Sequence, residues 1–178
     1  MSERIKILRE KHGHPSERAQ KKVVNYLATD VQSFIKKSPF AVISTADNHG
    51  NCDASPRGGH PGFVKILNDT TLIMPDVRGN RLLQSTSNLE ENPKAGFLFL
   101  IPGEQKSVRV NGQVEFLGVD EMNQLGIDNE LFNPDDSSQM IQGLKLTIDE
   151  AYLHCSRALS FSDLWNTDTI NDNASNKN

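Results

Sequence analysis

The sequence predicts a mainly β fold, a small antiparallel β-barrel of about six strands with peripheral helices. Short apolar and β-branched segments recur between turn-forming residues from Phe40 onward. Residues 107–117 alternate apolar with polar side chains, as a strand with two different faces does. A meander of such strands tends to close on itself, because closure removes exposed strand edges. At roughly 150 residues per domain, the 178 residues indicate one domain.

The expected strands lie in the middle of the chain, at residues 40–45, 51–57, 63–67, 71–74, 95–101 and 107–117. Turn-forming residues separate the first strand from the second and the third from the fourth. Residues 95–101 are apolar throughout, which is typical of a central strand. Gly112 is expected to allow a bend or bulge in the longest strand.

A helical segment is expected before the first strand. Its apolar residues recur at three- and four-residue steps: Val23, Val24, Leu27, Val31, Phe34 and Ile35. Asp30 could cap a second helix within this segment, and Pro39 ends it. The chain then divides into a helical extension, a barrel domain and a tail, at residues 1–22, 23–165 and 166–178. The tail is expected to be disordered, because one Ile and one Ala are its only apolar residues.

Other helices are expected within and after the sheet. One covers residues 80–91, with Asn80 as its N-cap and a buried stripe of Leu82, Leu83, Thr86 and Leu89. Short helices follow Leu117, one capped by Asp120 and one beginning at a capping box formed by Thr147 and Glu150.

Composition excludes several classes of protein. Nineteen Lys and Arg against 23 Asp and Glu give a formal charge of −4, whereas a non-specific nucleic-acid binder needs a large basic excess. The longest apolar run is far shorter than the roughly 20 residues that cross a bilayer, and the N-terminus lacks a signal peptide's apolar stretch. Cys52 and Cys155 are too few for a disulfide framework. We therefore expect a cytoplasmic protein with reduced thiols that binds neither nucleic acid nor membranes.

Several well-known catalytic and nucleotide-binding motifs are absent from the sequence, among them Gly-x-Gly-x-x-Gly, the P-loop, His-Glu-x-x-His and Gly-x-Ser-x-Gly. The five histidines do not cluster like the ligands of a closed metal site, so no metal is expected. His154 and Cys155 are adjacent, and adjacent side chains point in different directions. We therefore interpret them as packing residues rather than as a nucleophile and its base.

Two segments combine an arginine with residues suited to bind an anion. In the first, Asn80 stands at a helix N-cap position and is followed by Arg81 and Ser85. A helix N-terminus with an added arginine and hydroxyl groups is a phosphate site. In the second, Arg57 follows Ser55 and leads into two glycines, whose backbone N–H groups a ligand can approach closely.

A third polar group lies on the last strand, where Arg109 stands between Ser107 and Asn111 and requires an anionic or carbonyl partner. The sole tryptophan, Trp165, either pins the end of the chain to the core or stacks on a ligand. Plain structural interpretations remain open for all of these segments: a solvated helix face, a flexible turn with a surface arginine, or an internal salt bridge.

Taken in order, five short motifs resemble those of a known family. They are Thr45-Ala-Asp-x-x-Gly50, Asp53-x-Ser-Pro-Arg-Gly58, Gly79-Asn-Arg-Leu-x-x-Ser85, Asn92-Pro93 and Arg109-Val-x-Gly112. Residues 23–165 resemble the FMN-binding split barrel of the pyridoxamine 5′-phosphate oxidase superfamily. The resemblance is strongest to a branch of probable FMN-dependent proteins that also carry His-Cys near the C-terminus, as His154-Cys155 does here.

The resemblance implies a six-stranded antiparallel split β-barrel that forms a homodimer with two FMN sites at the subunit interface. It assigns the FMN phosphate to Arg57 and Arg81, with Asn80 and Ser85 nearby. The flavin ring would lie near residues of two strands and a partner tryptophan. The cofactor-binding candidates are then Ser55, Arg57, Pro75, Asp76, Asn80, Arg81, Ser85, Ser107, Arg109 and Trp165.

The implied function is an FMN-dependent oxidoreductase that transfers hydride between a reduced donor, with NAD(P)H as a candidate, and an unknown small molecule. The flavin would supply the chemistry, so no catalytic side chain is expected. No Arg or His follows Arg157, so the segment that grips the substrate phosphate in pyridoxamine-phosphate oxidases is missing. Two alternatives stay open: a haem-binding or haem-degrading split barrel with His60 or His154 as axial ligand, and a flavin-binding module without turnover.

Overall fold

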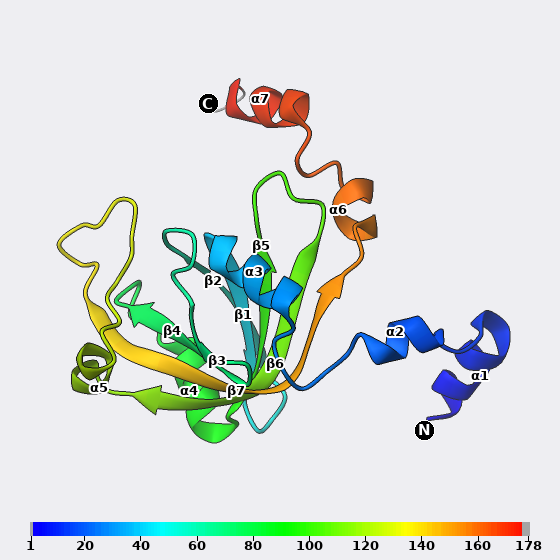
Figure 1. Ribbon diagram of the computed structural model, residues 1–178, viewed down its shortest axis with the longest axis horizontal. Coiled ribbons are helices and arrows are strands. Elements are labelled where there is room, and N and C mark those ends of the chain that lie inside the picture. Colours follow the sequence, from blue (N-terminus) through cyan, green and yellow to red (C-terminus); the bar gives the residue numbers. More distant parts are fainter. Residues whose placement is uncertain (1, 176–178) are drawn as a thin grey trace.

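A seven-stranded antiparallel sheet in the order β2-β1-β5-β6-β7-β4-β3 forms the body of residues 2–175, which the computed structural model describes (Figure 1). The strands are β1 (Phe40–Ala46), β2 (Cys52–Gly58), β3 (Lys65–Asn68), β4 (Thr71–Val77), β5 (Lys94–Leu100), β6 (Ser107–Leu117) and β7 (Met140–His154). The peripheral helices are α1 (Glu3–His12), α2 (Glu17–Lys21), α3 (Thr29–Lys37), α4 (Gln84–Glu91), α5 (Val119–Gln124), α6 (Arg157–Phe161) and α7 (Thr167–Ser175). The mainly β class with peripheral helices is confirmed, with one strand more than the six expected.

The additional strand is β7, and it replaces the helix that we expected to begin at Thr147. That expectation was wrong, because Leu144, Leu146 and Ile148 alternate with more exposed residues and pack into the core as a strand does. β7 pairs with β6 on one side and with β4 on the other, so it joins the two halves of the sheet.

The bulge predicted in β6 at Gly112 lies instead opposite Gly112, in β7. The pairing of β6 with β7 shifts register between Asn111 and Gly112, which leaves Asp149 of β7 without an opposite residue. A Cβ atom at Gly112 would collide with the carbonyl oxygen of Thr147. The absence of a side chain therefore lets the two strands approach at the bulge.

The barrel is closed on one side by side chains rather than by backbone pairing. The strand order of residues 2–175 makes β2 and β3 the edge strands and contains no β2–β4 pair. Arg57 of β2 and Asp76 of β4 nevertheless form an ion pair, with 3.4 Å between Nε and Oδ1. The sheet therefore curls until β2 faces β4, and the opening between them positions the candidate site.

The core lies inside this curl, and α3 covers it with the buried residues Val31, Phe34 and Ile35. These side chains confirm the apolar face that was predicted for this helix. The helix begins only at Thr29, however, so the predicted helical stripe from Val23 onward was too long. Val24 instead pairs with Ala151 of β7 in an isolated antiparallel bridge, beyond the end of the β4–β7 pairing at Thr147. An extended backbone there satisfies the N–H and C=O groups of Ala151 that β4 leaves unpaired.

The remaining helices lie at the periphery, and two differ from expectation. α5 begins after Gly118 rather than at Asp120, and the Glu121 carboxylate accepts the Gly118 N–H at 2.8 Å. Residues 166–175 are not disordered: Asn166 Oδ1 accepts the N–H groups of Asp168 and Thr169, which starts α7. Residues 176–178 of the expected disordered tail lie outside the described residues.

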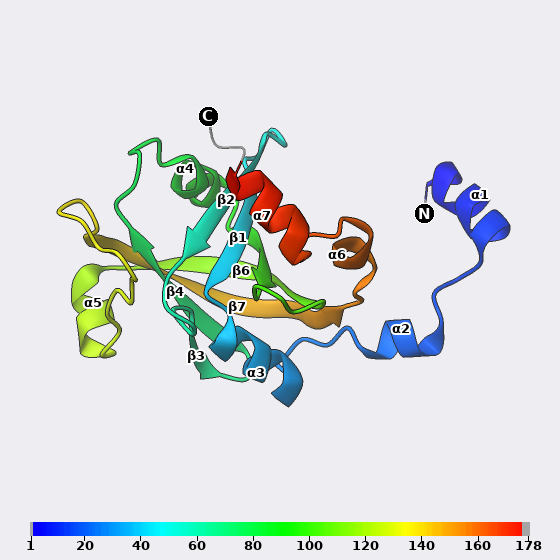
Figure 2. The ribbon, with the colours of Figure 1, turned by 90° about the horizontal axis from the view of Figure 1, so that it is seen from above.

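Both ends of the chain stand away from the body (Figures 1 and 2). α1, α2, α6 and α7 contain no buried residue. Among residues 2–175, none of the helices has the length and apolar character needed to cross a membrane.

Candidate functional site

A pocket of about 410 Å³ opens between β2, β4 and the segment that leads into α4. Ligand pockets range from roughly 300 to 1,000 Å³. Its lining includes seven of the ten predicted cofactor-binding residues, namely Ser55, Arg57, Pro75, Asp76, Asn80, Arg81 and Ser85. Folding therefore brings together the two arginine-bearing segments, around Arg57 and Arg81, that lie apart in the sequence.

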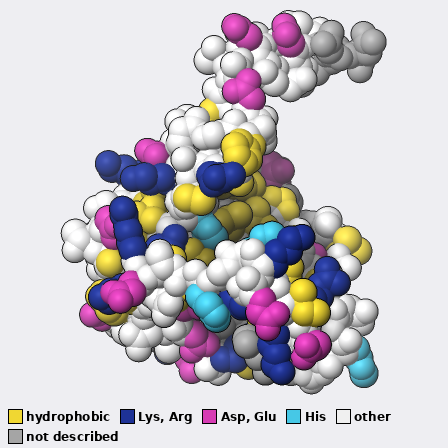
Figure 3. All heavy atoms as spheres, turned by 90° about the vertical axis from the view of Figure 1, so that its right-hand side faces the viewer, with side chains coloured by type: hydrophobic (Ala, Val, Ile, Leu, Met, Phe, Trp, Pro, Cys, Tyr) yellow, Lys and Arg dark blue, Asp and Glu magenta, His cyan; other side chains and the backbone are white. Residues whose placement is uncertain are grey.

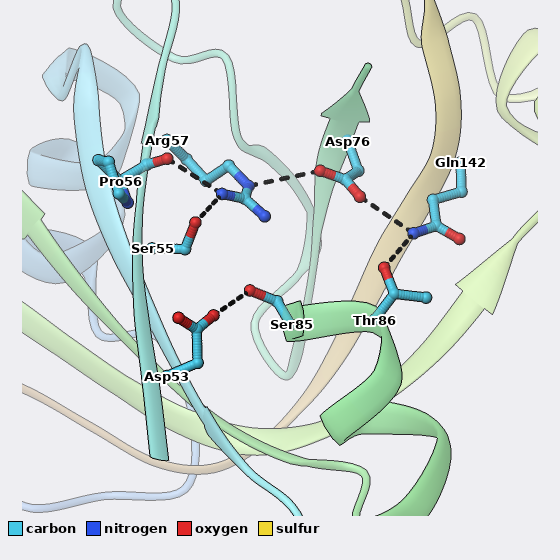
Figure 4. Close-up of polar contacts among 8 residues, drawn as sticks. All are labelled: Asp53, Ser55, Pro56, Arg57, Asp76, Ser85, Thr86 and Gln142. Atoms are coloured by element: carbon cyan, nitrogen blue, oxygen red, sulfur yellow. Dashed lines mark hydrogen bonds and ion pairs between the residues drawn. The ribbon is translucent and has the colours of Figure 1, made fainter. Parts of the chain in front are cut away.

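Arg57 is the central side chain of the pocket (Figure 4). Its Nη1 donates to the Pro56 carbonyl oxygen at 3.0 Å and to Ser55 Oγ, and its Nε faces Asp76 Oδ1 at 3.4 Å. Nε is buried and has no hydrogen-bond partner within residues 2–175. The other terminal nitrogen points into the space between β2 and α4. A guanidinium group held on two sides and open on the third is suited to bind a phosphate or carboxylate.

Asp76 and Gln142 hold the far side of this arginine. Asp76 is only 5% exposed, and the Gln142 side-chain amide donates to its Oδ2 at 3.0 Å. The same amide nitrogen donates to Thr86 Oγ1 at 3.0 Å, so Gln142 connects β4 to α4. Gln142 was not among the predicted site residues, although the alternation of apolar residues across Leu144 and Leu146 marks its strand.

Ser85 and Asp53 join α4 to β2. The Ser85 hydroxyl donates to Asp53 Oδ2 at 2.6 Å, and Ser85 is buried. Ser85 is therefore a buried residue of α4, although it was not part of the buried stripe predicted for this helix. Because the Ser85 hydroxyl hydrogen points to Asp53, it is not available to a ligand. The donors that the first turn of α4 can offer to a ligand near Ser85 are therefore its backbone N–H groups.

The start of α4 also differs from the predicted one. α4 begins at Gln84 after Leu83, which has a left-handed backbone (φ 52°), as does Arg81 (φ 64°). Asn80 is thus not an N-cap; its Oδ1 accepts the Leu82 N–H at 3.0 Å in a local turn. Leu82 and Leu83 were expected to be buried, but they are 66% and 53% exposed. This irregular loop places Arg81 at the rim of the pocket.

The third predicted group lies on the outer face of β6 and β7 and does not line this pocket. Arg109 Nη2 donates to Glu150 Oε1 at 2.7 Å, and Asn111 Nδ2 donates to the same oxygen at 2.7 Å. The Arg109 guanidinium also lies over the Tyr152 ring, 4.6 Å from its centre. The anionic partner that was predicted for Arg109 is therefore Glu150 of the same chain, which makes an internal salt bridge. Ser107, on the same strand, is buried.

Trp165 also lies away from the pocket within its own chain. Its indole N–H donates to the carbonyl oxygen of Glu104, in the loop between β5 and β6, at 2.9 Å. This contact attaches the end of the chain to the barrel. Of the two interpretations of Trp165, it agrees with the one in which the tryptophan pins the end of the chain.

His154 lies beside this third group. Its ring centre is 4.7 Å from that of Tyr152. Burial lowers the pKa of His154 below its ordinary value of 6.5, and the Arg109 and Lys22 cations lower it further.

Acidification from about pH 7 to pH 5.5 is therefore expected to destabilise the fold through His154. The unfolded chain protonates this histidine near pH 6.5, whereas the folded chain does so only at a lower pH, so the unfolded state binds more protons in between. Stability is lost as the pH falls through the unfolded pKa, and the loss levels off below the folded pKa. Urea unfolding at both pH values should show a smaller loss for His154→Gln than for the native chain; equal losses would contradict this role.

Other chemistries find less support in the geometry. Within residues 2–175, no three His, Cys, Asp or Glu side chains are placed to hold a metal ion. His60 stacks on Phe132 with 3.9 Å between ring centres, and neither His60 nor His154 lines the pocket. Cys52 and Cys155 are exposed and free.

The antiparallel sheet, which curls until β2 faces β4 and carries helices at its periphery, has the architecture of the split-barrel class of β proteins. Residues 27–155 match the family described as Pyridoxamine 5′-phosphate oxidase. Because the match covers well over half of the 178 residues, this chain belongs to that family.

Two solved structures share the fold. A candidate pyridoxamine 5′-phosphate oxidase from Lactobacillus delbrueckii is 17% identical, with a TM-score of 0.53 over 72% of this chain and 95% of that chain. A histidine-to-alanine variant of HupZ from Group A Streptococcus is 14% identical, with a TM-score of 0.52 over 72% of this chain and 99% of that chain. No curated protein matches the sequence.

Proposed function

We propose that this chain binds FMN in the pocket and acts, as a homodimer, as an FMN-dependent oxidoreductase on a small molecule other than pyridoxamine 5′-phosphate. The observation that carries the proposal is the Arg57 guanidinium, whose Nε is buried without a hydrogen-bond partner among residues 2–175 and whose free nitrogen points into the pocket. Membership of a family named for such an oxidase supports the choice of cofactor.

The residues of the pocket fit the phosphate end of FMN. Arg57 supplies a cation fixed by its protein partners, Arg81 supplies a second one at the rim, and the first turn of α4 supplies backbone N–H groups. When bound, FMN accepts and passes on hydride at its ring. This chain's own residues bind the anion, keep water out of the pocket and fix the position of Arg57.

The two carboxylates of the pocket have positioning roles in this proposal. Asp76, held by Gln142, fixes the Nε side of Arg57 so that its free nitrogen faces the ligand. Asp53 holds Ser85 and thereby ties α4 to β2. Both carboxylates already have protein partners, so the arginine nitrogen and backbone N–H groups are the donors that remain for a phosphate.

A homodimer would give the third polar group a role. The pocket of the same chain is not lined by Ser107, Arg109 or Trp165. In the proposed homodimer, these residues would lie near the flavin ring that the partner subunit binds. The outward face of β5 supports an interface, because Leu98 and Leu100 are only partly covered there. Free, exposed cysteines are in keeping with the proposed cytoplasmic location.

An absorbance spectrum of the purified protein, with mass identification of the compound released on heating, tests the cofactor. A two-banded flavin spectrum and a released mass equal to FMN are expected. A Soret band would replace the proposal with the haem alternative, and a colourless protein that FMN does not titrate would refute it. Bleaching of the flavin by NAD(P)H and recovery under air would separate an enzyme from a flavin-binding module.

Arg81→Ala is expected to weaken FMN binding roughly ten- to a hundredfold, because one charge-assisted contact contributes about 1.5–3 kcal/mol. Flavin fluorescence titration measures the dissociation constant. Arg18→Ala is the matched control, since Arg18 is an exposed cation on α2 and far from the pocket lining. An unchanged dissociation constant for Arg81→Ala would remove Arg81 from the site.

A further inference from the structure

The N-terminal arm, residues 2–22, lacks a partner surface. Its helices α1 and α2 bury no residue, and the arm stands away from the barrel in two perpendicular views (Figures 1 and 2). Ile5, Ile7 and Leu8 of α1 are 41%, 55% and 42% exposed. A single helix of ten residues is marginal in water without tertiary packing. The arm therefore has apolar side chains that a partner could cover.

The charge of the arm is opposite to that of the rest of the chain. Residues 2–22 contain seven Lys and Arg against three Glu, a charge of +4, whereas residues 23–178 contain 12 against 20 acids, a charge of −8. Among residues 2–175, Lys6 and Lys21 are the arm cations with ion-pair partners, and each pairs with a Glu of its own helix. Arg4 and Lys11 of α1 stay without an acidic partner there.

The C-terminal segment, residues 158–175, has the complementary character. It contains three Asp and no Lys, Arg or Glu. None of these acids, Asp163, Asp168 and Asp172, forms an ion pair within the described residues. Phe161, Leu164 and Ile170 are 75%, 44% and 46% exposed. The segment protrudes at the top of Figure 3, where its acidic side chains are visible.

The arm leaves the barrel in a direction that keeps it apart from this segment of its own chain. Val24 and Ala151 exchange backbone hydrogen bonds of 3.4 and 2.7 Å. Lys22 Nζ donates to the Leu153 carbonyl oxygen at 3.2 Å. These contacts tie the base of the arm to β7, and α1 and α7 lie well apart in both ribbon views.

We propose that the N-terminal arm of one copy packs on the C-terminal segment of a second copy. The apolar residues of α1 would cover those of α6 and α7, and the arm cations would face the three Asp. In a twofold dimer the contact forms twice, because each copy supplies one arm and one segment. This contact surface is separate from the pocket; it rests on the proposed homodimer but not on the proposed flavin.

Charge exchange between the two surfaces tests this contact in the full-length chain. The arm variant carries Arg4→Glu and Lys11→Glu, and the segment variant carries Asp168→Lys and Asp172→Lys. Sedimentation over a concentration series measures the dimer dissociation constant. Each variant alone should dimerise roughly tenfold or more weakly, because four attractive charge pairs per dimer become repulsive. The matched control, Lys36→Glu with Lys37→Glu at the exposed end of α3, should dimerise like the native chain.

An equimolar mixture of the two variants gives the decisive measurement. In the mixed dimer the acidic arm meets the basic segment and the basic arm meets the acidic one, so native affinity should return. A chain carrying all four substitutions should also dimerise normally. No recovery in the mixture, or native affinity in both single variants, would overturn the proposal. Binding of the native arm to anionic vesicles, with dimerisation unchanged in the variants, would overturn it in favour of a membrane contact.

The flavin spectrum separates this inference from the proposed function. A weakened dimer in the single variants with recovery in the mixture supports the arm contact even if the protein binds no flavin. An unchanged dimer in a protein that does bind FMN overturns the arm contact alone.

Discussion

Replacing Arg57 with alanine is expected to weaken FMN binding by roughly a hundredfold or more. The variant loses the charge-assisted contact of the free guanidinium nitrogen, which contributes about 1.5–3 kcal/mol. It also leaves the buried Asp76 carboxylate without its cation, and an unbalanced negative charge beside the pocket repels a phosphate. Titration with FMN, followed by flavin fluorescence, measures the loss.

The same substitution is expected to destabilise the fold, so the two effects must be separated. Removing one partner of a largely buried ion pair costs about 3 kcal/mol or more, reduced here because Gln142 still donates to Asp76. Arg57→Ala combined with Asp76→Asn removes both charges and should recover most of the stability. If Arg57 binds the phosphate, the double variant still binds FMN poorly. Native affinity in the double variant would show that Arg57 has only a structural role.

Arg57→Lys tests whether the fork geometry of the guanidinium matters. A lysine keeps the positive charge but cannot contact Ser55, Asp76 and a ligand from three directions at once. We expect an affinity between those of the native chain and Arg57→Ala. An affinity equal to the native one would reduce the role of Arg57 to its charge.

The strands could be predicted where the signal is local. In β6 the alternation of side chains has no interruption, and the predicted bounds agree with Ser107–Leu117. In β7 the bulge at Asp149 shifts the alternation by one residue. Thr147 and Glu150 stand at the spacing of a capping box, so the local pattern indicates a helix. Only pairing with β4 and β6, which is not local, selects the strand.

The sequence predicted which residues line the candidate site, but not which of them contact one another. Arg57 and Arg81 were identified from the glycines and small polar residues beside them, and both line one pocket. The contacts of Asp76 with Arg57 and with Gln142 join residues that are 19 and 66 positions apart in sequence. No periodicity connects such residues, because the curl of the whole sheet brings them together.

The start of α4 shows a second limit of local patterns. Asn80 has the chemistry of an N-cap, and it does accept a backbone N–H two residues later. The helix nevertheless starts four residues further on, because Ser85 is drawn toward Asp53 and Leu83 takes a left-handed backbone. The hydroxyl–carboxylate contact with β2 is formed, whereas Leu82 and Leu83 stay exposed.

Phe97→Ala is expected to lower the free energy of unfolding by about 3–5 kcal/mol, the cost of removing a fully buried aromatic side chain and leaving a cavity. Phe97 is 0% exposed at the centre of β5, and its ring stacks with that of Phe99 at 6.1 Å. β5 is paired on both sides, with β1 and β6, so the sheet has little freedom to collapse into the space. Urea unfolding at constant pH measures the change.

Leu98→Ala is the matched control, because Leu98 is the next residue of β5 and its side chain points to the opposite, partly exposed face. Its truncation should cost less than half as much as that of Phe97, since neighbouring side chains and water can fill the space. Equal costs for the two variants would contradict the assignment of the inner and outer faces of β5. Because Phe97 does not line the pocket, Phe97→Ala should bind FMN with native affinity below its unfolding transition, unlike Arg57→Ala.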